Sequence, residues 1–424
     1  MKRNRARARP SGNRRLDARG AFGFDMRSIA GQTQKPRSAR SEFRKEDFIN
    51  HRNIVFATFC LANIAISFSF AALAAAVSVI SRDLSVSDII VSRISAYYMI
   101  PYGLGALLYA PLSKRFSFKI ILAATMVMYA VTNLICATAH SMDMILWARI
   151  FMGLAAASVV PLCLISIGAL FPKEIRGRLV GLFFSTSFMA SVSGIIVSGI
   201  FPWRWLFILP AVLSVLTALG VMIGGDIHPG EKPLGRIDYL KVLNNADIRN
   251  VLIFIFTISF LYHGVHKWLG VYLNRMYHVE QWTISLFFML IAIFGAIGQN
   301  VGGYITDKKG RYIACQIGVS ILSLMTMLLL GTYPLVVLGI ILSLFSVGWT
   351  IGHNGVSTVL TDFPDENRAE IASLNSAVRF FSGGLGFFLG GSFVEKNFGL
   401  TFFGFGVLML ISLGFLKKII PQEL

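Results

Sequence analysis

Three ionisable side chains, His263, His266 and Lys267, lie close together in one long apolar segment. With Ser259 and Gly270 they recur at helical spacing, which places them on one face of a helix. A basic side chain at the centre of a membrane helix costs about 2.5–3.5 kcal/mol on insertion scales, so such residues usually face a wet cavity. We therefore expect a solute-binding stripe here. His263 and His266 are also the candidates for proton coupling, because histidine titrates near neutral pH.

Other apolar segments are also interrupted by polar side chains. Together with Ser259, His263, His266 and Lys267, the candidate substrate cavity comprises Asn63, Ser67, Arg149, Thr350 and His353. No Asp or Glu lies near the middle of an apolar segment. A basic pocket without acids suits an anionic or a polyhydroxylated organic solute. The alternative is structural, because serine and threonine often join neighbouring membrane helices, and Arg149, His353 and Arg379 could be buried hydrogen-bonding centres.

The sequence indicates no enzyme. It contains no nucleophile–base set, phosphate-binding loop or cluster of metal ligands. Its four cysteines fall inside apolar segments without the spacing of a metal site, which is typical of small core residues. We expect no cofactor, no metal and no nucleic-acid partner.

The composition is that of a membrane protein. Of the 424 residues 55% are hydrophobic and only 14% are charged. Residues 1–52 hold 15 Lys and Arg against 5 Asp and Glu, and few large apolar side chains, so we expect a disordered basic tail. It could be a cytoplasmic arm, an electrostatic anchor to anionic lipid or nucleic acid, or a transit peptide.

Twelve apolar segments are long enough to cross a bilayer as helices, which needs about 20 residues each. They span 53–80, 88–112, 119–139, 143–171, 178–200, 203–224, 249–274, 281–304, 312–331, 334–361, 370–394 and 399–418. The polar stretch 225–248 divides them six and six, so we expect bundles over 53–224 and 249–424 joined by a cytoplasmic linker. Basic residues concentrate in alternate loops, which predicts that both termini are cytoplasmic.

The two halves repeat one another. Phe171-Pro172-Lys173-Glu174-Ile175-Arg176 reappears 192 positions later as Phe363-Pro364-Asp365-Glu366-Asn367-Arg368. Gly194 and Gly199 match Gly386 and Gly391 at the same offset. A parallel duplication of six helices is an architecture of secondary transporters.

The segment Gly302–Arg311 lies between two apolar segments, and we expect it to be a short loop whose turn at Gly310 needs an unusual backbone. Its residues Gly303, Asp307, Lys308, Gly310 and Arg311 resemble a loop signature of the major facilitator superfamily. Arg149 followed by Gly153, and Trp203-Arg204-Trp205, also resemble this superfamily. The resemblance covers about residues 53–418 and implies an all-α membrane protein with twelve transmembrane helices in two pseudo-symmetric six-helix bundles.

Two departures from the family pattern stand out. The first-half loop has Lys114 and Ser117 where the family usually has Asp and Gly. The fifth helix lacks the proline that drug antiporters of the superfamily usually carry between Gly194 and Gly199.

The resemblance implies a monomeric secondary active transporter in the plasma membrane that moves a small organic solute by alternating access, coupled to H⁺ or Na⁺. The alternatives are a drug or sugar efflux antiporter and a non-transporting sensor. The resemblance also implies a charged gate at the cytoplasmic side. Its candidate residues are Lys114, Arg115, Arg176, Arg178, Asp307, Lys308, Gly310, Arg311 and Glu370.

Overall fold

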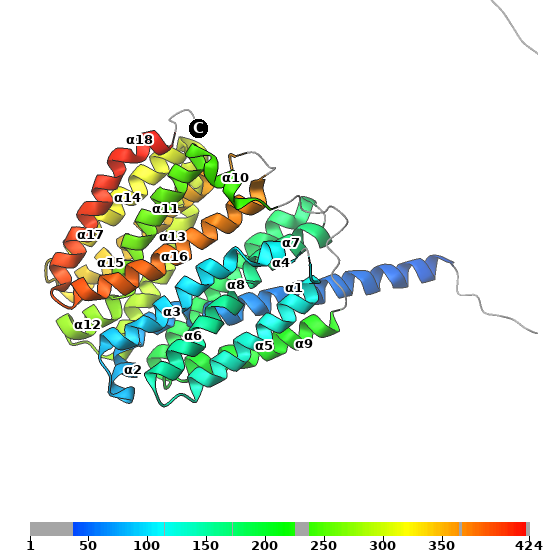
Figure 1. Ribbon diagram of the computed structural model, residues 1–424, viewed down its shortest axis with the longest axis horizontal. Helices are drawn as coiled ribbons and strands as arrows, with labels where there is room; N and C mark the ends of the chain where they lie inside the picture. Colours follow the sequence, from blue (N-terminus) through cyan, green and yellow to red (C-terminus); the bar gives the residue numbers. More distant parts are fainter. Residues whose placement is uncertain (1–36, 114, 172, 225–236, 364–366, 421–424) are drawn as a thin grey trace, which may run out of the picture. The chain divides into compact units, whose positions relative to one another are not determined.

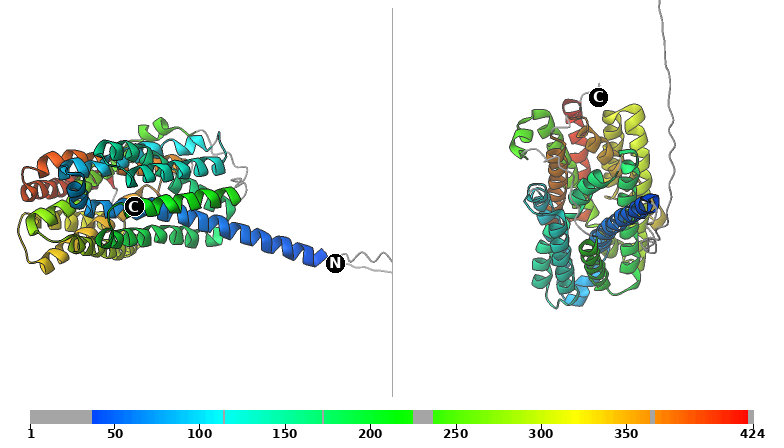
Figure 2. Two further views of the ribbon diagram at one scale, coloured as in Figure 1. Left: turned by 90° about the horizontal axis from the view of Figure 1, so that it is seen from below. Right: turned by 90° about the vertical axis from the view of Figure 1, so that its right-hand side faces the viewer.

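The computed structural model describes residues 37–113, 115–171, 173–224, 237–363 and 367–420. The chain divides into two compact units, residues 1–49 and 50–424. The second unit contains all the predicted membrane helices. Within the described residues the secondary structure is helical throughout, and the helices of the second unit run roughly alongside one another (Figures 1 and 2).

Each predicted membrane helix is present, some as two consecutive pieces. The first half holds α1 (Arg37–Ala75), α2 (Val77–Leu84), α3 (Asp88–Ala106), α4 (Tyr109–Leu112), α5 (Phe118–Ala137), α6 (Met142–Ala156), α7 (Val159–Leu170), α8 (Lys173–Ile200) and α9 (Trp205–Ile223). After α10 (Tyr239–Asn244), the second half holds α11 (Ala246–His266), α12 (Leu269–Tyr277), α13 (Gln281–Lys309), α14 (Arg311–Leu328), α15 (Leu335–Val359), α16 (Arg368–Val394), α17 (Phe398–Ser412), a 3₁₀ turn (Leu413–Phe415) and α18 (Leu416–Ile419).

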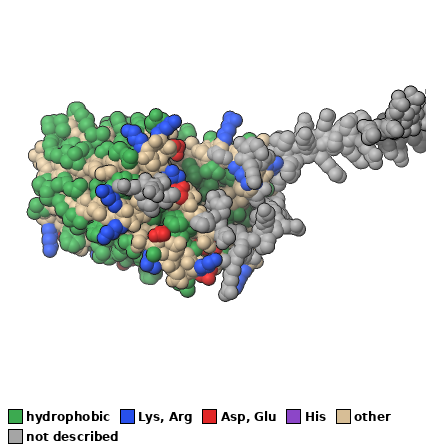
Figure 3. All heavy atoms as spheres, turned by 90° about the horizontal axis from the view of Figure 1, so that it is seen from above, with side chains coloured by type: hydrophobic (Ala, Val, Ile, Leu, Met, Phe, Trp, Pro, Cys, Tyr) green, Lys and Arg blue, Asp and Glu red, His purple; other side chains and the backbone are tan. Residues whose placement is uncertain are grey.

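Eleven of these helices in the described chain are long and apolar enough to cross a membrane. The predicted helix 88–112 is present as α3 and α4 but is not among the eleven. Asp88, Arg93 and Pro101 lower its mean hydropathy. In the structure α3 packs against α6 and α16. In the face that Figure 3 shows, hydrophobic side chains cover broad areas between the charged residues, as expected of a protein surrounded by lipid.

Four membrane helices of the described chain are discontinuous. The first breaks at Ala76, the second at Leu107 and Leu108, the fourth at Ala157 and Ser158, and the seventh at Lys267 and Trp268. Broken helices in transporters free backbone groups near the bilayer midplane, where solutes bind. The break in the seventh helix coincides with the predicted polar stripe.

The segment 302–311 is more helical than expected. Helix α13 continues to Lys309, so the predicted loop shrinks to Gly310 alone. Lys308 and Lys309 occupy the last turn of α13, where positive charge is stabilised by the helix dipole. The prediction for Gly310 is confirmed: its φ of 88° belongs to a region that side chains disfavour.

Two long helix pairs make most of the contact between the two halves in the described chain. Helix α3 packs along α16, and α8 packs along α13 (Figure 1). The second pair is antiparallel, because Ser198 near the end of α8 bonds to Ser285 near the start of α13 at 3.1 Å. We name the two ends of the helix set the Arg275 end and the Arg311 end, after residues that lie there.

Candidate functional site

A cavity of about 830 Å³ lies between the two halves. Its walls come mainly from α8 on one side and from α11, α13 and α15 on the other, with Ala71 of α1 contributing. Toward the Arg275 end its lining is closed, since Ile195 and Phe288 are each 1% exposed. Toward the Arg311 end Phe184, Gln299 and Asn300 are exposed. The cavity is therefore accessible from the Arg311 end.

The lining combines apolar side chains with uncharged polar ones, and it holds no charged side chain among the residues that the structure describes. Serine hydroxyls come from α8, amides from α13 and a threonine hydroxyl from α15. These polar groups belong to Ser185, Ser187, Ser191, Gln299, Asn300, Ser346 and Thr350. One histidine, His266, also lines the cavity. Several such groups already bond to backbone, as when Thr350 donates to the Ser346 carbonyl at 3.0 Å.

An aromatic stack forms one wall. Tyr262 of α11 and Trp349 of α15 lie face to face, with ring centroids 3.8 Å apart and planes 5° apart. His266 extends the stack on the Tyr262 side at 5.2 Å, and His353 extends it on the Trp349 side at 5.3 Å. Because each helix contributes two rings four residues apart, the order of the rings follows from helical geometry. Because the rings cover one another's faces, the stack offers the edges of Tyr262 and Trp349 to a solute as a rigid wall.

The two candidate histidines of α11 have different surroundings. His263 donates from Nδ1 to the Ser259 carbonyl at 2.9 Å, and its ring lies directly under Gly383 of α16. His266 lines the cavity, and its buried Nδ1 has no hydrogen-bond partner among the described residues. Only His266 is thus placed to meet a solute in this conformation.

Lys267 lies outside the cavity lining. It is 1% exposed, donates from Nζ to the Phe70 carbonyl of α1 at 2.9 Å, and sits 3.9 Å above the centre of the Phe70 ring. No described carboxylate forms an ion pair with it. A desolvated cation–π contact contributes about 2 kcal/mol, whereas burying an ammonium costs several kcal/mol. The charged form of Lys267 is therefore poorly compensated here.

Arg149, Asn63 and Ser67 tie elements of the first half together. Arg149 is 2% exposed, donates to the Ile94 carbonyl at 3.1 Å and lies 4.2 Å from the centre of the Tyr98 ring. Asn63 donates to the Phe183 carbonyl at 2.7 Å, and the Ser67 carbonyl accepts from Ser191 at 3.3 Å. None of the three lines the cavity, so the prediction that they bind solute stays untested.

His353 and Arg379 form a polar pair between α15 and α16. Arg379 Nη1 donates to His353 Nε2 at 2.7 Å, and Ser357 Oγ lies 3.3 Å from the same nitrogen. A ring nitrogen that accepts from a guanidinium carries no proton, so His353 is neutral, with its proton on Nδ1. Arg379 is held behind the stack rather than in the cavity.

The family model described as Major Facilitator Superfamily matches residues 59–391. The chain belongs to this superfamily. An uncharacterized MFS-type transporter of Bacillus subtilis, YwfA, is 26% identical over 300 residues, which are 67% of this chain and 72% of the relative. A probable L-galactonate transporter of Escherichia coli is 23% identical over 251 residues, 54% of this chain and 55% of its own length.

Solved structures share the superfamily fold. A D-xylose–proton symporter superposes with a TM-score of 0.74 at 14% identity, covering 88% of this chain and 98% of that one. A bacterial homologue of the human lysosomal transporter Spinster, captured facing inward, gives 0.73 at 15% identity and covers 87% and 97%. The fold expectation is thereby confirmed: the chain is a multi-pass membrane transporter of this superfamily, not an enzyme.

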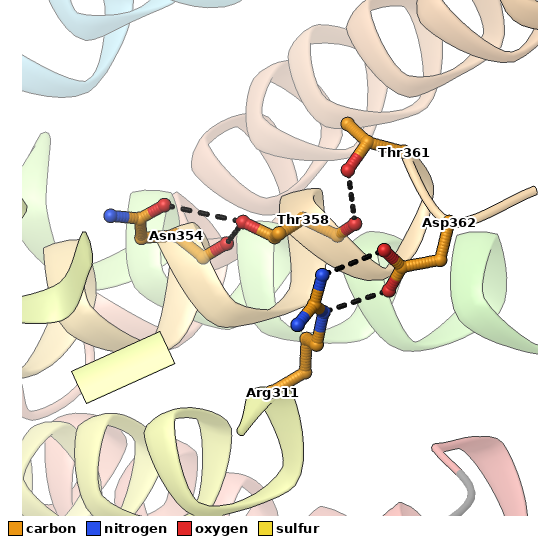
Figure 4. A network of polar contacts seen from close by, with 5 residues as sticks. All are labelled: Arg311, Asn354, Thr358, Thr361 and Asp362. Carbon is orange, nitrogen blue, oxygen red and sulfur yellow. Dashed lines mark hydrogen bonds and ion pairs between the residues drawn. The ribbon is translucent and has the colours of Figure 1, made fainter. Parts of the chain in front are cut away.

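Of the residues that match the superfamily loop signature, Arg311 meets a partner in its own half. Arg311 binds Asp362 through two bonds of 2.7 Å, beside a smaller network of Asn354, Thr358 and Thr361 (Figure 4). Asp307 and Lys308 are exposed and join no described ion pair. Asp362 is therefore already paired within the second half.

The other gate candidates are only partly described. Lys114 lies outside the described residues, and Arg115 and Arg178 are exposed. Arg176 donates to the Phe171 carbonyl at 2.7 Å within its own loop, and Glu370 is 7% exposed. A charged gate between the halves at the Arg311 end stays a prediction.

The Arg275 end of this transporter is closed by contacts that sequence reasoning missed. Arg275 of α12 donates from Nε and Nη2 to Asp88 of α3, each at 2.8 Å. Gln281 donates to the Ala75 carbonyl at 3.1 Å. Each of these contacts joins one half to the other.

The sequence analysis also does not single out three residues of the cavity lining, namely the amides Gln299 and Asn300 and the aromatic Trp349.

Proposed function

We propose that this protein is a secondary active transporter for a neutral, polyhydroxylated small solute. The observation that carries the proposal is the cavity lining, where hydroxyls and amides face an aromatic stack and no described residue is charged. Hydroxyl groups of a solute can exchange bonds with serine and amide side chains, while its apolar face packs on Trp349. An ionic solute would meet no opposite charge here.

The transporter works by alternating access, with its two halves rocking about the cavity. If both termini are cytoplasmic, as the loop charges predict, the described state faces inward, with the Arg275 end closed and the Arg311 end accessible. Residence in the plasma membrane belongs to the same proposal. His266 is the proton-coupling candidate that lies in the cavity wall in this state.

An anionic solute is the second candidate, favoured by one observation. Arg379 is only half-buried and contacts the aromatic stack through His353. If Arg379 left His353, its guanidinium could bind a carboxylate at the cavity edge.

A thermal-shift screen of the purified protein against neutral polyols and sugars, sugar acids and organic cations tests the proposal. We expect neutral polyols or sugars to raise Tm, and we expect Trp349→Ala to abolish that shift. Trp147→Ala is the matched control, since Trp147 is 66% exposed on another helix and should leave it intact. Uptake of the best ligand into proteoliposomes then separates a transporter from a sensor. Stabilisation by organic cations alone would contradict the proposal, and stabilisation by acids alone would favour the second candidate.

A further inference from the structure

The surroundings of Lys267 are those of a side chain that changes its charge during the working cycle. It occupies the break between α11 and α12 and contacts α1 close to the break at Ala76, so the contact joins the two halves. Its partners are a backbone carbonyl and an aromatic face. A neutral amine can still donate to that carbonyl, more weakly than an ammonium does but without an uncompensated buried charge.

A second cation lies close by. Arg149 contacts Tyr98, whose ring is 6.2 Å from that of Phe70, and Lys267 lies on Phe70. The two positive groups are thus separated by two aromatic rings, and the charge of Arg149 repels that of Lys267. In the described membrane spans Asp and Glu occur only near the ends, so no carboxylate offsets this repulsion.

The remaining groups around Lys267 do not supply an anion. Helix α1 contributes Phe70, and helix α11, which ends just before Lys267, contributes His263 and His266. The titratable or charged groups around this region are Tyr98, Tyr129, Arg149, Tyr262, His263 and His266. Arginine stays charged at all accessible pH values, whereas lysine can lose its proton when it is buried.

We propose that Lys267 is a reversible proton-binding site that links protonation to the opening of the Arg275 end. In the closed arrangement Lys267 is neutral and donates to the Phe70 carbonyl. When α1 and α11 separate, water reaches the amine, which then binds a proton. The bound proton favours the open arrangement, because reclosing would bury the ammonium beside Arg149 without a counter-ion.

The test uses cysteine labelling and needs no solute, so its outcome does not depend on the proposed cargo. Ser285, which is 2% exposed between the halves at the Arg275 end, is replaced by cysteine in a chain whose four native cysteines are alanine. A maleimide reports how often this end opens between about pH 6 and about pH 9. His278→Cys, at an exposed position, corrects for the pH dependence of the thiol reaction itself.

We expect labelling of Ser285→Cys to fall as pH rises, by up to about tenfold per pH unit, the limit for one proton. Lys267→Met, which cannot bind a proton, should give slow labelling at every pH. Lys267→Arg, which cannot lose one, should give fast labelling at every pH. If Lys267→Arg does not fold, Lys267→Gln serves as a second neutral variant and should behave as Lys267→Met does.

The histidines provide the decisive control. His263→Gln and His266→Gln should both keep the pH dependence of the wild type. The proposal is overturned if the wild type shows no pH dependence, if the Lys267 variants keep it, or if a histidine variant loses it while the Lys267 variants do not.

Discussion

The rings of His263 and His266 differ in the partners available to them, although both lie on α11. His263 is fixed by the Ser259 carbonyl and by the close approach of Gly383, where an added Cβ would come within 2.8 Å of Nδ1. His266 has a ring nitrogen beside the cavity that finds no hydrogen-bond partner in the described part of the chain. A structural role for the first and a binding role for the second follow from this difference.

This difference predicts opposite effects of two matched substitutions. His266→Phe keeps the stacking on Tyr262 but removes both nitrogens, so affinity for the cargo should fall about tenfold, the worth of one good hydrogen bond. His263→Phe should lower Tm and leave affinity nearly unchanged, because it removes the buried side-chain hydrogen bond to the Ser259 carbonyl and places a larger ring against Gly383. Isothermal titration and thermal unfolding in detergent distinguish the two, and equal losses of affinity would contradict the assignment.

Asp83 joins the end of α2 to the start of α9. It accepts from Arg204 at 2.7 Å and from Trp203 at 3.0 Å, and the hydrogen bond from Arg204, followed by that from Trp203, lowers the pKa of the Asp83 carboxyl. A lowered pKa means that the contact stabilises the fold above the unfolded value, near pH 4, and is lost as pH falls through the folded value. The pair is partly solvated, so its contribution should stay below about 1 kcal/mol.

We therefore expect Asp83→Asn to lower Tm slightly at neutral pH, with the difference from wild type shrinking in acid. Thermal unfolding of both proteins at neutral pH and at a pH below about 4 measures this difference in Tm. An undiminished difference at the lower pH would show that packing, rather than charge, is responsible.

At the scale of helices, glycine sets how closely neighbours approach. Gly318 of α14 lies against the backbone of Gly352 in α15, where an added methyl group would overlap backbone atoms that cannot move aside. Gly318→Ala should therefore force α14 and α15 apart and destabilise the fold by roughly 1–3 kcal/mol. Gly414→Ala is the matched control, since nothing lies within 4 Å of its added Cβ. Denaturant unfolding of both variants provides the comparison, and equal stabilities would disprove the tight contact.

The sequence predicts the membrane helices well because length and hydropathy report directly on burial in lipid. The breaks at Leu107 and Ala157 each lie four residues before a proline, Pro111 and Pro161, whose ring removes the helical hydrogen bond to that carbonyl. The sequence does not predict the breaks at Ala76 and Lys267, since no proline follows either of them within a helical turn. For the same reason the stripe of α11 does not act as one face: His266 reaches the cavity while Lys267, beyond the last helical residue, turns to Phe70. Such contacts depend on the register of segments about 200 residues apart, which hydropathy leaves undetermined.

At the scale of the whole transporter, the Arg275 end is held closed by a small number of bonds between the halves. Asp88 is mostly buried, with 12% of its side chain exposed, so its loss of Arg275 would leave a poorly solvated carboxylate. Arg275→Glu should therefore favour opening of this end, and Asp88→Arg in the same chain should partly restore closure. Labelling of Ser285→Cys measures both. Unchanged labelling in Arg275→Glu would show that helix packing alone closes this end.

The aromatic stack belongs entirely to the second half, whereas the serines of the opposite wall belong to α8 in the first half. A cargo molecule must then bridge two bodies that move past each other. A compound that covers Trp349 but is too short to reach Ser187 and Ser191 would occupy the site without drawing the walls together. Such a compound should compete with the transported solute and inhibit transport. The width of the cavity therefore distinguishes inhibitors from transported solutes.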